Sequence, residues 1–72
     1  MRRARSIRDE ASLSLRQVEE LTGIDHSAVS KFETGLGMGI ENIGKLAACY
    51  GEKLERQITI DELVQEEAAV GG

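Results

Sequence analysis

The sequence predicts a small all-α protein, a compact bundle of four or five short helices in a chain of 72 residues. The chain has no proline and eight glycines, a pattern typical of short helices that end at glycine turns. Apolar residues recur at spacings of three and four, as on one face of a helix. Hydrophobic residues make up 40% of the chain and aromatic residues 3%, so mainly Leu, Ile, Val and Ala must fill the core.

The first two helices are predicted from their apolar faces and one capping signal. Residues 2–11 are good helix formers, and one face carries Ala4, Ile7, Arg8 and Ala11. Ser14 precedes Gln17 by three positions, the spacing of a capping box, and Gly23 ends the apolar pattern that follows. A second helix of about two turns is therefore expected over residues 15–22.

A third helix is predicted almost immediately after the second. Asp25 is a suitable N-cap for residues 26–34, and Gly35 is a suitable stop. Val29 and Phe32, three residues apart, indicate its buried side. Two short helices are thus joined by a turn of about three residues.

A fourth helix is predicted from Gly39 to just before Gly51. Its apolar stripe consists of Ile40, Ile43, Leu46, Ala47 and Tyr50. Gly44 inside this helix costs about 1 kcal/mol relative to alanine, which favours a site where another backbone packs closely.

The segment after Gly51 permits two interpretations. Apolar and polar residues alternate over residues 54–61, the period of a strand, and a helix is the alternative for residues 53–60. Thr59 precedes Glu62 at a second capping-box spacing, which predicts a last helix over residues 60–69.

The charge of the chain is unevenly distributed. Nine basic and thirteen acidic residues give a net charge of −4, which argues against indiscriminate coating of nucleic acid. Residues 1–35 are neutral overall and begin with a run of arginines, so the second half carries the whole surplus of acid.

The remaining composition excludes several classes of protein. Cys49 is the single cysteine, so an internal disulfide or a four-thiolate metal site is impossible, and we interpret it as an inert apolar residue in a cytoplasmic protein. No apolar run reaches the length of a membrane span. The single histidine stands in no recognisable catalytic arrangement, so we expect no enzyme, no cofactor and no metal.

Two segments carry a family resemblance. The sequences LSLRQVEELTGI over residues 13–24 and SAVSKFETG over residues 27–35 resemble the helix-turn-helix of the lambda-repressor-like, XRE-type family of DNA-binding domains. IENIGKLA over residues 40–47 and Tyr50-Gly51 continue the match, which covers residues 5–51. The resemblance implies a bundle in which the third helix enters the major groove of DNA and the second lies across the backbone.

The resemblance also implies roles for particular residues. The outward positions of the third helix become candidates for base contacts: His26, Ser27, Ser30 and Lys31. Candidates for backbone contacts are Ser14, Arg16 and Thr34, with Arg2, Arg3 and Arg5 of the N-terminal run. Solvation alone is the plain alternative for the histidine, the serines and the terminal arginines. Arg8 and Glu33 match a structural ion pair. Leu15, where relatives have glutamine, and the uncharged Leu36-Gly37-Met38 depart from the family pattern.

The expected function is sequence-specific transcriptional regulation. A single recognition helix reads few base pairs, so a repressor is expected to bind two operator half-sites as a homodimer. We expect residues 1–51 to bind double-stranded DNA, and residues 52–72 to form a dimerisation segment and acidic tail, with an interface at Leu54, Ile58 and Ile60. The alternative is an antitoxin or anti-regulator that binds a protein partner through its C-terminal segment.

Overall fold

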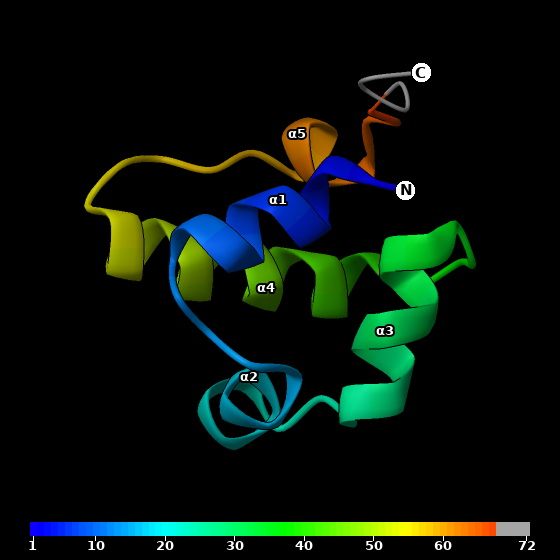
Figure 1. Cartoon of the computed structure of the whole chain (residues 1–72), viewed down its shortest axis with the longest axis horizontal. Coiled ribbons are helices and arrows are strands. Elements are labelled where there is room, and N and C mark those ends of the chain that lie inside the picture. Colours follow the sequence, from blue (N-terminus) through cyan, green and yellow to red (C-terminus); the bar gives the residue numbers. More distant parts are fainter. Residues whose placement is uncertain (68–72) are drawn as a thin grey trace.

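The computed structural model describes residues 1–67, which form five helices around one core (Figure 1). The helices are α1 Arg3–Glu10, α2 Leu15–Thr22, α3 His26–Thr34, α4 Ile40–Leu54 and α5 Ile60–Val64. The central helix α4 packs against α1, α2 and α5, and α3 packs against α1 and α2. The predicted all-α bundle is confirmed, and the described residues contain no sheet.

Caps fix the helix-turn-helix formed by α2 and α3. The Ser14 hydroxyl accepts from the Gln17 N–H at 3.1 Å, and the Gln17 side chain accepts from the Ser14 N–H at 2.8 Å. Gly23 ends α2 with a φ of +78°, a backbone conformation that favours glycine. The Asp25 carboxylate accepts from the Ser27 N–H at 3.1 Å and so caps α3. The capping signals in this part of the sequence are confirmed.

The core is aliphatic around the two aromatic residues of the chain. Phe32 and Tyr50 are fully buried, and Phe32 lies on the inner side of α3. The other buried hydrophobic residues are Ala4, Ile7, Leu13, Val18, Ile24, Val29, Ile43, Leu46, Ala47, Ile58 and Leu63. Residues from every helix share this core, so the orientation of α3 depends on the whole described chain.

Helix α4 does not stop at Gly51, contrary to the prediction. It continues to Leu54 and ends at Glu55, which takes the left-handed conformation with a φ of +54°. A Cβ atom at position 51 would lie 2.8 Å from the Arg56 carbonyl oxygen, whereas a Cβ at Gly44 would meet nothing within 4 Å. The close approach expected at Gly44 therefore occurs at Gly51, where the chain turns back over the helix end.

Both interpretations of residues 53–60 need correction. Residues 53 and 54 complete α4, residues 55–59 form a loop, and Ile60 begins α5, so this segment is neither a strand nor a continuous helix. Helix α5 ends at Val64, earlier than predicted, and the end of the predicted helix at residues 68 and 69 lies outside the described residues. Helix α4 runs across the expected domain boundary between residues 51 and 52. Residues on both sides of that boundary therefore share one hydrophobic core.

The two ends of the described chain lie together (Figure 1). The Arg3 N–H donates to the Gln65 carbonyl at 2.7 Å, and the Glu67 N–H donates to the Met1 carbonyl at 3.0 Å. An isolated antiparallel bridge joins Arg2 to Glu66 between them. None of the described helices is long and apolar enough to cross a membrane.

Candidate nucleic-acid interface

The outer side of α3 carries the four residues predicted to contact bases. Val29, Phe32 and Glu33 are buried on the inner side, so the helical period turns the intervening positions outward. Ser27 and Lys31 are exposed, and His26 and Ser30 are half-buried. The outer side of α3 thus presents one ammonium group, two hydroxyls and one imidazole.

A carboxylate of α2 holds the first residue of α3. One oxygen of Glu19, Oε1, lies 3.2 Å from the His26 backbone nitrogen and 2.7 Å from its Nδ1. Sequence reasoning missed this contact, because seven positions separate the two residues and the turn alone brings them together. A signal was nonetheless available, since the first N–H groups of any helix need acceptors.

Asp25 completes the acidic cap of α3. Hydrogen bonds from the Ser27 side chain and from its backbone N–H hold the pKa of the Asp25 carboxyl below its usual value of 3.8. Potential ligand atoms of Asp25, Glu19 and His26 lie within 4.8 Å of one another. Both carboxylates already accept N–H bonds at the positive end of α3, where negative charge is stabilised and a cation is not. Helix capping explains the cluster.

The start of α2 carries two of the predicted backbone contacts. Ser14 and Arg16 are exposed and lie near the positive end of this helix. Arg16 takes part in no hydrogen bond or ion pair with any other described residue. Thr34, at the far end of α3, is also exposed, and its hydroxyl donates to the Lys31 carbonyl at 2.8 Å.

Two of the three N-terminal arginines, Arg2 and Arg5, are engaged within the chain. The Arg2 guanidinium lies 4.5 Å from the centroid of the Phe32 ring, and its Nη1 donates to the carbonyls of Phe32 at 3.2 Å and Leu36 at 2.8 Å. A cation is favourable at this C-terminal end of α3. Arg3 is half-buried on α1, while Arg5 is exposed and pairs with Asp9 at 3.5 Å. Sequence reasoning missed the role of Arg2 in binding the end of α3.

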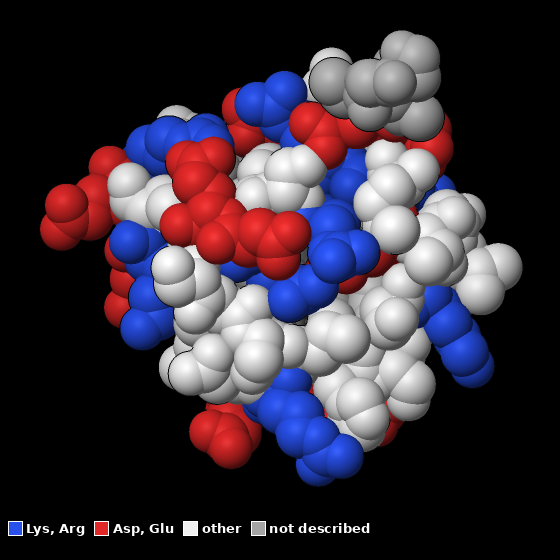
Figure 2. All heavy atoms as spheres, viewed as in Figure 1, with Lys and Arg blue, Asp and Glu red and all other residues white. Residues whose placement is uncertain are grey.

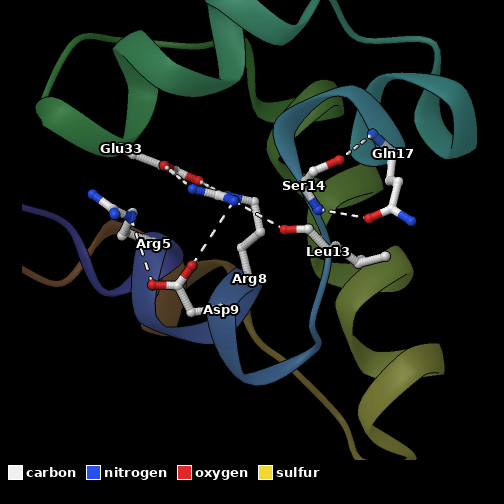
Figure 3. Close-up of polar contacts among 7 residues, drawn as sticks. All are labelled: Arg5, Arg8, Asp9, Leu13, Ser14, Gln17 and Glu33. Atoms are coloured by element: carbon white, nitrogen blue, oxygen red, sulfur yellow. Dashed lines mark hydrogen bonds and ion pairs between the residues drawn. The ribbon is translucent and has the colours of Figure 1, made fainter.

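A buried ion pair connects α1 to α3 (Figure 3). The Nε and Nη2 atoms of Arg8 donate to the two carboxylate oxygens of Glu33 at 2.7 and 3.1 Å. Nη1 donates to the Leu13 carbonyl at 2.9 Å. The hydrogen bonding that Arg8 donates to the Glu33 carboxylate raises the pKa of Arg8, although burial opposes this shift. Because Arg8 binds Glu33 through two hydrogen bonds, the pair fixes the rotation of α3 relative to α1 as well as its position.

The three residues expected at a dimer interface all contact the core of their own chain. Ile58 is buried, whereas Leu54 and Ile60 are half-buried and pack against the core from outside. Larger apolar exposure occurs elsewhere, at Leu36 and Ile40, whose exposed fractions are 56% and 70%. Burial raises the pKa of the half-buried Cys49 thiol, which keeps it protonated and weakly reactive.

Charged groups of both signs mix on the face that carries α1 (Figure 2). In the same view, uncharged side chains cover most of the surface over α3 and the loop that follows it. This face does not form a continuous basic patch, so strong attraction to any nucleic acid is not built into it.

Comparison with known proteins agrees with this geometry. A helix-turn-helix family model matches residues 5–63, which run from within α1 to within α5 and include α2, α3 and α4 in full. Searches of curated proteins and of solved structures gave no significant match. The matched region contains the capped turn, the buried side of α3 and the ion pair that orients it. The chain therefore belongs to the XRE-type, lambda-repressor-like helix-turn-helix family of DNA-binding regulators.

Proposed function

We propose that this protein is a sequence-specific transcriptional repressor that binds an operator with two half-sites as a homodimer. The observation that carries the proposal is the outer side of α3, where Ser27 and Lys31 are exposed, together with the exposed Arg16 at the start of α2. A helix in the major groove presents such side chains to base edges, and the preceding helix contacts phosphates.

The chemistry of these side chains suits recognition of a duplex. The Lys31 ammonium can donate to O6 or N7 of guanine, and the Ser27 hydroxyl can donate or accept. Arg16 can bind a phosphate near the positive end of α2. The carboxylates of Glu19 and Asp25 lie close to this surface and weaken attraction to DNA that offers no matching bases.

The test begins with selection of binding sites from a pool of random duplexes. We expect the selected duplex to bind more tightly than a scrambled one, with affinity that falls as salt rises. Lys31→Ala should weaken specific binding by about 10–100-fold, the value of a good base contact. Lys53→Ala removes the same charge at the opposite end of α4 from α3 (Figure 1) and serves as control. Equal affinity for selected and scrambled duplexes would refute the proposal.

Dimerisation is a separate part of the proposal with its own measurement. Leu54 and Ile60 keep some exposed surface, and the neighbouring Val64 is 36% exposed, which supports an apolar contact at the C-terminal end. Sedimentation of the protein alone and with a two-site duplex should give a twofold stoichiometry. Monomers in both samples would exclude the homodimer and leave DNA binding itself intact.

A second candidate function is masking of a protein partner, as an antitoxin or anti-regulator does. The exposed side chains of Leu36 and Ile40 favour it, because they place apolar surface beside the candidate DNA interface. Deletion of residues 52–72 is a poor test, since it removes Ile58 and Leu63 from the core. A double substitution of Leu36 and Ile40 by serine should instead abolish co-purification of a stoichiometric partner. Retention of that partner would argue against this surface.

A further inference from the structure

We infer that Glu19 is a positioning residue for base recognition, because it fixes the His26 ring so that Nε2 faces the DNA as a hydrogen-bond acceptor. The inference rests on the proposed function, which places His26 at the major groove.

The geometry restrains the ring through two bonds to one oxygen. Glu19 Oε1 lies 3.2 Å from the His26 backbone nitrogen and 2.7 Å from Nδ1. The backbone bond anchors that oxygen to the first turn of α3, so the ring must take the rotamer that reaches it. Side-chain exposures of 36% for His26 and 40% for Glu19 show that the pair lies at the surface, where DNA can approach the ring.

The carboxylate also selects the tautomer of the neutral ring. An ionised carboxylate accepts hydrogen bonds and cannot donate them, so Nδ1 must carry the proton. The other nitrogen, Nε2, then has a lone pair, and the geometry of the ring directs it away from Glu19. No hydrogen bond joins Nε2 to any described residue.

An acceptor at this position discriminates between bases. In the major groove, adenine N6 and cytosine N4 are donors, whereas guanine O6 and N7 and thymine O4 are acceptors. The fixed ring of His26 in its neutral form therefore favours adenine or cytosine at one position of each half-site. A ring released from Glu19 can rotate and exchange tautomers, and so can offer either a donor or an acceptor.

Glu19→Gln is the informative variant, because it keeps the shape of the side chain. Its amide oxygen can still accept from Nδ1–H and from the His26 backbone N–H, but the amide can also turn and donate to a bare Nδ1 if it gives up the backbone bond, so Glu19→Gln weakens the preference for one tautomer. Glu20→Gln is the matched control: it removes the same charge from the next residue of α2. Glu20 is exposed and takes part in no hydrogen bond or ion pair with the other described residues.

The experiment measures base preference at each position of the selected site for the wild type, both glutamine variants, His26→Ala and the double variant Glu19→Gln/His26→Ala. We expect Glu19→Gln to reduce discrimination at one position by about 5–10-fold, the value of one hydrogen bond. Glu20→Gln should leave that position unchanged. In the His26→Ala background, Glu19→Gln should have no further effect there.

A nitrogen-15 NMR spectrum of the wild-type imidazole at mildly alkaline pH supplies a readout independent of DNA. It should show the proton on Nδ1, and it decides the inference even if Glu19→Gln fails to fold. A proton on Nε2, or an unaltered base preference in Glu19→Gln whatever its effect on overall affinity, would overturn the inference. Absence of any sequence preference in the wild type would instead refute the proposed function, with the tautomer still measurable.

Discussion

Removal of one partner from the buried ion pair of Arg8 and Glu33 should destabilise the fold strongly. Glu33→Gln keeps the size of the side chain but leaves the Arg8 guanidinium with no buried counter-charge. The side chains are 10% and 4% exposed, so water offers little compensation, and breaking such a pair typically costs about 3–5 kcal/mol. Arg8 retains the Leu13 carbonyl at 2.9 Å and Asp9 at 3.9 Å, so we expect a loss of roughly 2–4 kcal/mol.

This loss is large for a chain of this size, whose total stability is expected to be roughly 4–11 kcal/mol. Urea unfolding followed by circular dichroism measures it directly. Glu20→Gln, on an exposed carboxylate, should change the free energy of unfolding by less than about 0.5 kcal/mol. The double variant Arg8→Met/Glu33→Gln should recover part of the loss, because no buried charge is left unpaired. Equal losses in Glu33→Gln and the control, or a double variant no more stable than Glu33→Gln, would refute the reasoning.

Two further predictions concern local features. Gly51→Ala should lower stability by about 1–3 kcal/mol, because its Cβ would lie 2.8 Å from the Arg56 carbonyl oxygen; Gly44→Ala, with nothing within 4 Å of the new Cβ, should raise it by about 0.5–1 kcal/mol. Thermal melts of both variants check the contrast, and a rise in both would exclude a tight contact at Gly51. The hydrogen bonds from Ser27 lower the pKa of Asp25 from its usual value of 3.8. The contribution of this carboxylate to the free energy of unfolding is therefore fully present above the usual pKa and is lost as pH falls through the lower pKa of the folded state. Asp25→Asn should therefore flatten the acid side of a plot of melting temperature against pH, and an unchanged acid side would contradict the assignment.

The features predictable from sequence were those encoded within a few residues. Capping at Ser14 and Asp25 and the stop at Gly23 depend on neighbouring side chains and on one backbone conformation. Helical periodicity likewise identifies the inner side of α3 through Val29 and Phe32. Local signals of this kind are sufficient to predict the helix-turn-helix and its outer side, because neither depends on contacts with distant segments.

The predictions that failed concern features that depend on contacts between distant segments. Gly51 reads as a helix stop, yet its role is to admit the returning chain at Arg56. The alternation after Leu54 resembles a strand, but Ile58 points into the core from a loop. The hydrogen bond between Glu19 and His26 likewise crosses the turn, so no periodic pattern in the sequence could reveal which ring nitrogen of His26 is hydrogen-bonded.

The contacts at the chain ends change how net charge bears on DNA binding. Glu66 pairs with the N-terminal ammonium at 3.3 Å, and Arg2 is bound to the end of α3. These groups stabilise the fold, so the N-terminal run of arginines is not a fully available basic arm. The helix-turn-helix that carries Lys31 and Arg16 also carries the two carboxylates of the α3 cap, Glu19 and Asp25. Few cationic groups can then neutralise phosphates, and discrimination between sequences must come mainly from the base edges that α3 contacts.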